Sequence, residues 1–101
     1  MTVDAAERIA RLQLARSERI GPVTFAQLMA RYGTAAAALD ALPGVIRKAG
    51  GAAYTAARIE DVESEVARGE ALGARLLVIG EPDYPPALAA VDPAPPVLWI
   101  R

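Results

Sequence analysis

Residues 17–25 read Ser-Glu-Arg-Ile-Gly-Pro-Val-Thr-Phe, and this stretch decides the predicted fold. Apolar residues at helical spacing come before it and after it. Pro22 suits the first position of a helix, because proline lacks the amide hydrogen that would be unpaired there. The stretch therefore predicts a tight turn between two short helices, the first over 5–16 and the second over 22–32.

An Ile-Gly-Pro turn between short helices has the shape of a helix-hairpin-helix element, in which turn amides and the next helix N-terminus can face a phosphate. The strong DNA-binding form has Gly-Ile-Gly in the turn, whereas Arg19 stands at the first glycine position here. A β-carbon there restricts the turn and the backbone approach. A structural turn is the favoured interpretation. Phosphate contact is the alternative, and its donors would be Arg19, the amides of Gly21 and Val23, and the Thr24 hydroxyl.

Composition limits the chemistry that is available to this chain. Its 101 residues are 53% apolar and 23% charged, which is typical of one globular domain. Much of the apolar share is alanine, so we expect a thin core. Histidine and cysteine are absent, which excludes disulfides, thiolate chemistry and histidine-based acid–base catalysis, and argues against zinc. No glycine-rich nucleotide motif follows a strand. We expect no catalytic residue, no metal site and no cofactor.

No targeting or membrane segment is apparent in the sequence. The N-terminus lacks the basic and apolar regions of a signal peptide. No uncharged apolar run approaches the ~18 residues that a membrane span needs. We therefore expect a cytoplasmic location and no membrane partner.

The charge is unevenly divided along the chain. The net charge is −1, but residues 1–50 carry seven basic and four acidic groups, and residues 51–101 carry four basic and eight acidic groups. Any phosphate-facing surface should lie in the first half. Arg47 and Lys48 form a second basic spot beside a Gly-Gly pair. A solvated surface is the default for such a pair, and nucleic-acid contact is the alternative.

Capping residues mark the ends of the expected helices. Asp4, with Glu7 three residues later, predicts a capping box at the start of the first helix. Gly33 should end the second helix. A third helix over 35–42 should end at Pro43 and be followed by a short helical piece over 45–48. A longer helix, capped by Thr55, should cover 56–72.

In the final third of the chain the spacing of apolar residues no longer follows a helical period. The apolar run over 75–79 is typical of a buried parallel strand. A proline-rich loop, one or two helical turns and a second strand over 97–100 follow it. These segments predict the β-α-β start of a Rossmann-type sheet over 74–101, after a helical domain over 1–73. Since two strands are too few for an independent sheet, we expect the chain to be the front of a longer protein.

Taken in order, these segments resemble the N-terminal part of the DNA-processing protein A family (DprA, also called Smf), from about residue 12 to residue 101. The resemblance rests on segments 17–25, 31–34, 41–43, 72–77, 80–86 and 94–98. The segment 80–86, Gly-Glu-Pro-Asp-Tyr-Pro-Pro, is the most specific of them. The structural signature consists of Gly21, Pro22, Gly80, Pro82, Asp83, Tyr84, Pro85 and Pro86. Asp83 and Tyr84 are interpreted as shaping the loop and not as an acid–base pair.

The resemblance implies a recombination mediator that binds single-stranded DNA, helps to load the RecA recombinase and acts in natural transformation. It also implies a mainly α fold, a SAM-like or helix-hairpin-helix bundle of four to five helices that leads into a Rossmann-type core. The family's main DNA pocket, RecA contact and homodimer contact belong to that core, most of which lies beyond residue 101. The alternatives are a protein–protein interaction module with no DNA contact of its own and, third, an enzyme whose phosphate loop would lie downstream.

Overall fold

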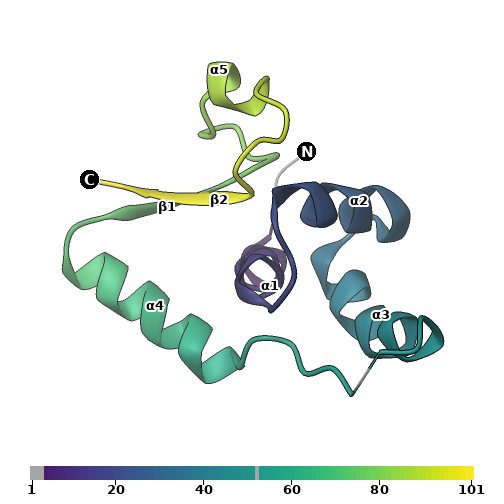
Figure 1. The fold of residues 1–101 in the computed structure, drawn as a ribbon. Helices are drawn as coiled ribbons and strands as arrows, with labels where there is room; N and C mark the ends of the chain where they lie inside the picture. Colours follow the sequence, from purple (N-terminus) through teal and green to yellow (C-terminus); the bar gives the residue numbers. More distant parts are fainter. Residues whose placement is uncertain (1–3, 52) are drawn as a thin grey trace.

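The computed structural model describes residues 4–51 and 53–101 (Figure 1). Five helices and two strands are found in that part of the chain. In order they are α1 (Ala5–Arg16), α2 (Pro22–Tyr32), α3 (Ala35–Lys48), α4 (Ile59–Ala71), β1 (Arg75–Val78), α5 (Pro86–Ala89) and β2 (Val97–Ile100). The expected mainly helical bundle followed by a short sheet is therefore confirmed.

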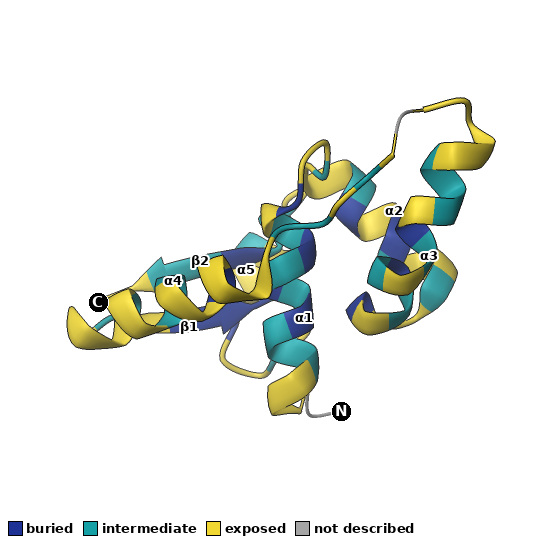
Figure 2. Cartoon of the chain, turned by 90° about the horizontal axis from the view of Figure 1, so that it is seen from below, coloured by how far each residue is buried: buried dark blue, intermediate teal, exposed yellow. Residues whose placement is uncertain are grey.

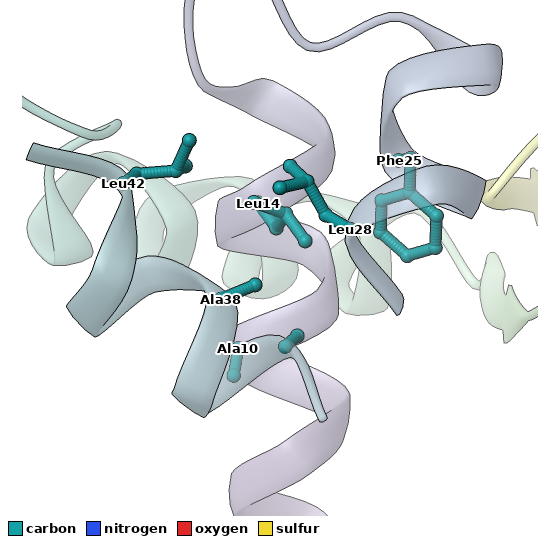
Figure 3. Packing of buried hydrophobic residues seen from close by; sticks show 7 residues of the cluster. Ala10, Leu14, Phe25, Leu28, Ala38 and Leu42 are labelled. Carbon is teal, nitrogen blue, oxygen red and sulfur yellow. The ribbon is translucent and has the colours of Figure 1, made fainter. Parts of the chain in front are cut away.

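Helix α1 lies at the centre of the molecule, with α2 and α3 on one side and α4 and the sheet on the other (Figure 1). One face of α1 contributes Ala10 and Leu14 to a first core shared with α2 and α3. Figure 3 shows Leu14 pointing toward Leu28 and Ala38. The fully buried Leu12 belongs to a second core, which α1 shares with α4 and both strands.

The second core joins the helical part of the chain to the sheet. Its buried members from outside α1 are Val62, Leu76, Val78 and Val97. In Figure 2 the buried residues gather along α1 and the strands, while exposed residues cover much of α4. The division into a domain over 1–73 and a second over 74–101 stays a prediction, and this core contains residues from both ranges.

The two strands pair antiparallel, with Arg75 opposite Ile100 and Val78 opposite Val97. The expected parallel pairing is therefore wrong. A parallel crossover needs a helix long enough to carry the chain back along the sheet, but α5 has only four residues. The connection instead folds back over the end of β1, where the Ile79 amide donates to the Pro96 carbonyl at 2.9 Å. The expected burial of the first strand is confirmed for Leu76 through Val78.

Local sequence signals predicted the bounds of α1 and α2 correctly. The structure has both helices over the expected residues, and Gly33, with φ of +82°, ends the second. Asp4 caps α1 by accepting the Glu7 amide at 2.8 Å. The carboxylate of Glu7, however, bonds to α3 and Arg11, so the expected capping box is replaced by a contact between helices.

Two later helix boundaries differ from expectation. Helix α3 does not stop at Pro43 but continues to Lys48. Leu42 and Ile46, on either side of the proline, both pack on the first core, and their burial outweighs the loss of one backbone hydrogen bond. Helix α4 begins at Ile59 with Arg58 as its N-cap, and not at residue 56 after Thr55.

Candidate functional site

The turn between α1 and α2 covers residues 17–21 and winds tightly around Arg19. Arg19 has φ of +66°, in the left-handed region that glycine adopts at little cost. The Ile20 amide donates to the Ser17 carbonyl across the turn at 3.3 Å. Arg19 thus takes the backbone conformation that favours glycine and adds an exposed cationic side chain.

The N-terminus of α2 opens to solvent beside Arg19. Gly21 is the N-cap and brings no side chain to the first amides of the helix. The Phe25 amide donates to the Gly21 carbonyl at 2.9 Å, whereas the amides of Val23 and Thr24 have no partner among the hydrogen bonds of the described residues. Val23 is 53% exposed. The four donors expected from the turn therefore belong to one short stretch of the chain, in which Arg19, Gly21 and Val23 are exposed and Thr24 is half-buried.

Hydrogen bonds connect the turn and the end of α1 to the segment before α4. The buried Ser17 hydroxyl donates to the Gln13 carbonyl at 2.8 Å and accepts the Ala57 amide at 3.0 Å. The Gln13 side chain donates to the Ala57 carbonyl at 2.8 Å. The Tyr54 hydroxyl donates to the Glu18 carbonyl at 2.7 Å. We call these four bonds the turn clasp. They explain why α4 starts late, because hydrogen bonds to the turn engage Tyr54 and Ala57, and residues 54–57 are not helical.

The pKa of the Tyr54 hydroxyl lies above its ordinary value. Burial raises the pKa of its hydroxyl and the neighbouring Glu18 carboxylate acts in the same direction, while the hydrogen bond with the turn and Arg19 act against them. The hydroxyl therefore remains a neutral donor at physiological pH. Through this hydroxyl Tyr54 connects the segment before α4 to the turn.

The second basic spot divides between two hollows. Arg47 lines a small hollow with Tyr54, and Tyr54 connects that hollow to the turn. Lys48 lines a different hollow, a groove that it shares with Arg31. The structure therefore brings Arg47 toward the turn through Tyr54 but assigns Lys48 to a different surface.

Three basic side chains of α1 form ion pairs within the fold. The ion pairs are Arg8–Glu81, Arg11–Glu7 and Arg16–Glu65. Arg8 also donates to the Leu76 carbonyl, and Arg11 to the Ile79 carbonyl. The basic residues that remain in the first half are Arg19, Arg31, Arg47 and Lys48, each of which is exposed. The arginine side chains of α1 therefore connect this helix to the first strand, to the residue after it and to α4.

Glu7 links α1 to the N-terminus of α3. Its carboxylate accepts the Ala35 amide at 2.9 Å and the Ala36 amide at 3.4 Å, in addition to the Arg11 guanidinium. Burial alone would raise the pKa of Glu7, but the two amides and Arg11 more than compensate, and the pKa is lowered. An anion at a helix N-terminus is also favoured by the helix dipole.

The loop over 80–86 is held at both ends. Gly80 has φ of +94°, and a β-carbon there would lie 3.0 Å from the Arg11 guanidinium. Glu81 accepts the Val78 amide and pairs with Arg8. The Tyr84 ring is buried, and its hydroxyl donates to the Pro95 carbonyl at 2.7 Å. These contacts give the loop a defined shape, and they leave Asp83 exposed beside Arg75.

Several important side chains carry no clear sequence signal. Gln13, Ser17 and Tyr54 act together only because the fold brings residues about forty positions apart into contact. Glu81 was visible within the loop motif, but its partner Arg8 lies at the other end of the chain. Tyr54 offered the one hint, as a lone aromatic residue in a segment of small and polar ones.

The described residues contain no group of three acidic side chains placed to hold a metal ion. In the same part of the chain, each helix is too short or too polar to cross a membrane.

Comparison with known proteins identifies one family. The family model described as the DprA-like N-terminal HHH domain matches residues 5–67, from the start of α1 well into α4. No curated protein matches the chain.

Proposed function

The chain belongs to the family of DprA-like N-terminal HHH domains, and we propose that the whole protein binds single-stranded DNA. We further propose that it helps to load RecA during natural transformation in the cytoplasm, as the sequence resemblance implies. In this proposal the helical module is non-catalytic. The Rossmann-type core would carry the main DNA pocket, the RecA contact and the homodimer contact.

The α1–α2 turn is the feature of this module that best supports a direct contact with DNA. Arg19 and Val23 are exposed and Thr24 is half-buried, and the amides of Val23 and Thr24 have no partner among the hydrogen bonds of the described residues. Backbone amides at a helix N-terminus favour an anionic group, because the helix dipole and the unpaired donors act together. The contact is auxiliary, because only one cation belongs to the turn itself and DNA affinity grows with the number of phosphates neutralised.

A salt titration with oligo-dT tests this contact. We expect weak binding by this chain, with a log–log slope of about −0.7 for each phosphate contacted. The absence of binding at ~50 mM salt, or a slope near zero, would remove the DNA role from the module. It would favour the alternative of a protein-interaction module with no DNA contact of its own.

Two substitutions at one position separate the side chain from the backbone. Arg19→Ala removes the charge and keeps a β-carbon at the left-handed position, whereas Arg19→Gly removes both. If the guanidinium binds phosphate, both variants should bind oligo-dT about twofold to fivefold more weakly. If the amides alone bind, Arg19→Gly should bind at least as well as the parent. Arg58→Ala, at the exposed N-cap of α4, is the matched control and should change little.

A further inference from the structure

A groove of about 480 Å³ lies between the end of α2 and the second half of α3. Its floor consists of apolar residues of α3 and its C-cap, namely Ala41, Gly44, Val45 and Ala49. A β-carbon on Gly44 would meet no atom within 4 Å, so the space above the floor is open. Such a floor can bury an apolar side chain of a partner.

The sides of the groove are positively charged. Arg31 of α2 and Lys48 of α3 both line it, and neither forms an ion pair with a carboxylate of the described residues. The Arg31 guanidinium lies 5.2 Å from the centroid of the Tyr32 ring, which holds it beside the groove. No acidic residue belongs to the described lining. Charge complementarity therefore selects an anionic partner.

The combination of an apolar floor and few cations fits a protein segment better than a nucleic acid. Nucleic-acid affinity depends mainly on several phosphate contacts and on stacking with free aromatic faces. Tyr32 is the only aromatic residue of the lining, and Arg31 already covers one face of its ring.

We propose that this groove docks an acidic protein segment with an apolar anchor side chain. The anchor lies on the floor over Gly44, and carboxylates of the segment pair with Arg31 and Lys48. This interaction goes beyond the DNA contact at the α1–α2 turn and does not depend on it, because the two surfaces share no residue.

The test is a selection from short random peptides displayed on phage, with Gly44→Leu as the counter-selection target. Leucine at position 44 should occupy the groove without loss of folding, because a β-carbon there meets no atom within 4 Å, the groove lies beside it, and leucine favours the helix. Circular dichroism of the variant checks the fold. We expect the parent chain to enrich peptides in which an apolar residue is flanked by Asp or Glu.

Binding constants of an enriched peptide then assign the contacts. Gly44→Leu should weaken binding at least about tenfold, since it removes the anchor position. Lys48→Glu should weaken it about twofold to fivefold or more, and raised salt should do the same. Arg58→Glu makes the same kind of charge reversal at the N-cap of α4 and should leave binding unchanged.

Three results would overturn the proposal. One is a selection that yields no peptide distinguishing the parent from Gly44→Leu. Another is enrichment of basic or uncharged peptides. The third is direct binding of oligo-dT to the parent chain that Gly44→Leu abolishes, which would assign the groove to nucleic acid. Absence of oligo-dT binding by the parent chain, with peptide binding retained, would instead contradict only the proposed DNA contact.

Discussion

Replacing Arg19 by glycine is expected to stabilise the protein. The left-handed backbone at φ of +66° costs a residue with a β-carbon about 1–2 kcal/mol. Glycine removes this cost but gives the unfolded chain extra freedom, which offsets about 0.4–1 kcal/mol of the gain. The free energy of unfolding should therefore rise by about 1 kcal/mol. For a chain of this length that gain raises Tm by roughly 4–8 °C.

Arg19→Ala is the control that isolates the β-carbon. It removes the same charge as Arg19→Gly but keeps the backbone cost, so its stability should stay near that of the parent. Urea unfolding followed by circular dichroism measures both variants, and equal slopes would confirm that the midpoints report stability. If Arg19→Gly is no more stable than Arg19→Ala, the backbone of the turn is not under the strain inferred from its φ angle.

Three further substitutions test contacts that hold α4 and the turn. Gly69→Ala should destabilise the protein by about 1–3 kcal/mol despite the better helix propensity of alanine, because the new β-carbon would lie 2.4 Å from the Trp99 ring; tryptophan fluorescence reports the displaced ring. Ser17→Ala should cost about 1 kcal/mol, since it leaves the half-buried Ala57 amide without its partner, as measured by thermal unfolding. The hydrogen bond from Arg16 lowers the pKa of Glu65 against the effect of burial, so its stabilisation is present above the ordinary value near 4.5 and is lost as the pH falls through the folded value. Unfolding midpoints should therefore fall less steeply on acidification in Glu65→Gln than in the parent.

The parts of the fold that sequence analysis predicted correctly depend on local signals. Asp4, Pro22 and Gly33 act within one or two turns of their own helices, so their patterns were sufficient to bound α1 and α2. The buried character of β1 followed from its unbroken apolar run. The direction of strand pairing did not, since it depends on how the connection over 79–96 folds back.

The errors share one physical cause, which is competition from contacts between distant residues. A proline normally ends a helix, but the burial of Ile46 on the first core continues α3 past Pro43. Thr55 is a suitable cap, but the turn clasp engages Tyr54 and Ala57 on either side of it, and α4 starts only at Ile59. The candidate donors of the turn were found from sequence, whereas the clasp that positions them was not.

Because α1 serves both cores, the helical part of this chain should not behave as a separable unit in unfolding. Removal of the strands would expose Leu12 and Val62, which are 0% and 1% exposed in the fold. Loss of α2 and α3 would in turn expose Leu14, on the other side of the same helix. We therefore expect Trp99 fluorescence, which follows the sheet, and far-ultraviolet circular dichroism, which follows the helices, to give one coincident urea transition. Transitions that separate would mean that α1 can keep one set of neighbours without the other. The central helix thus couples the two cores, so we expect unfolding to be cooperative. Truncation of the chain after residue 73 should destabilise the packing of α1 and α4 as well as remove the sheet.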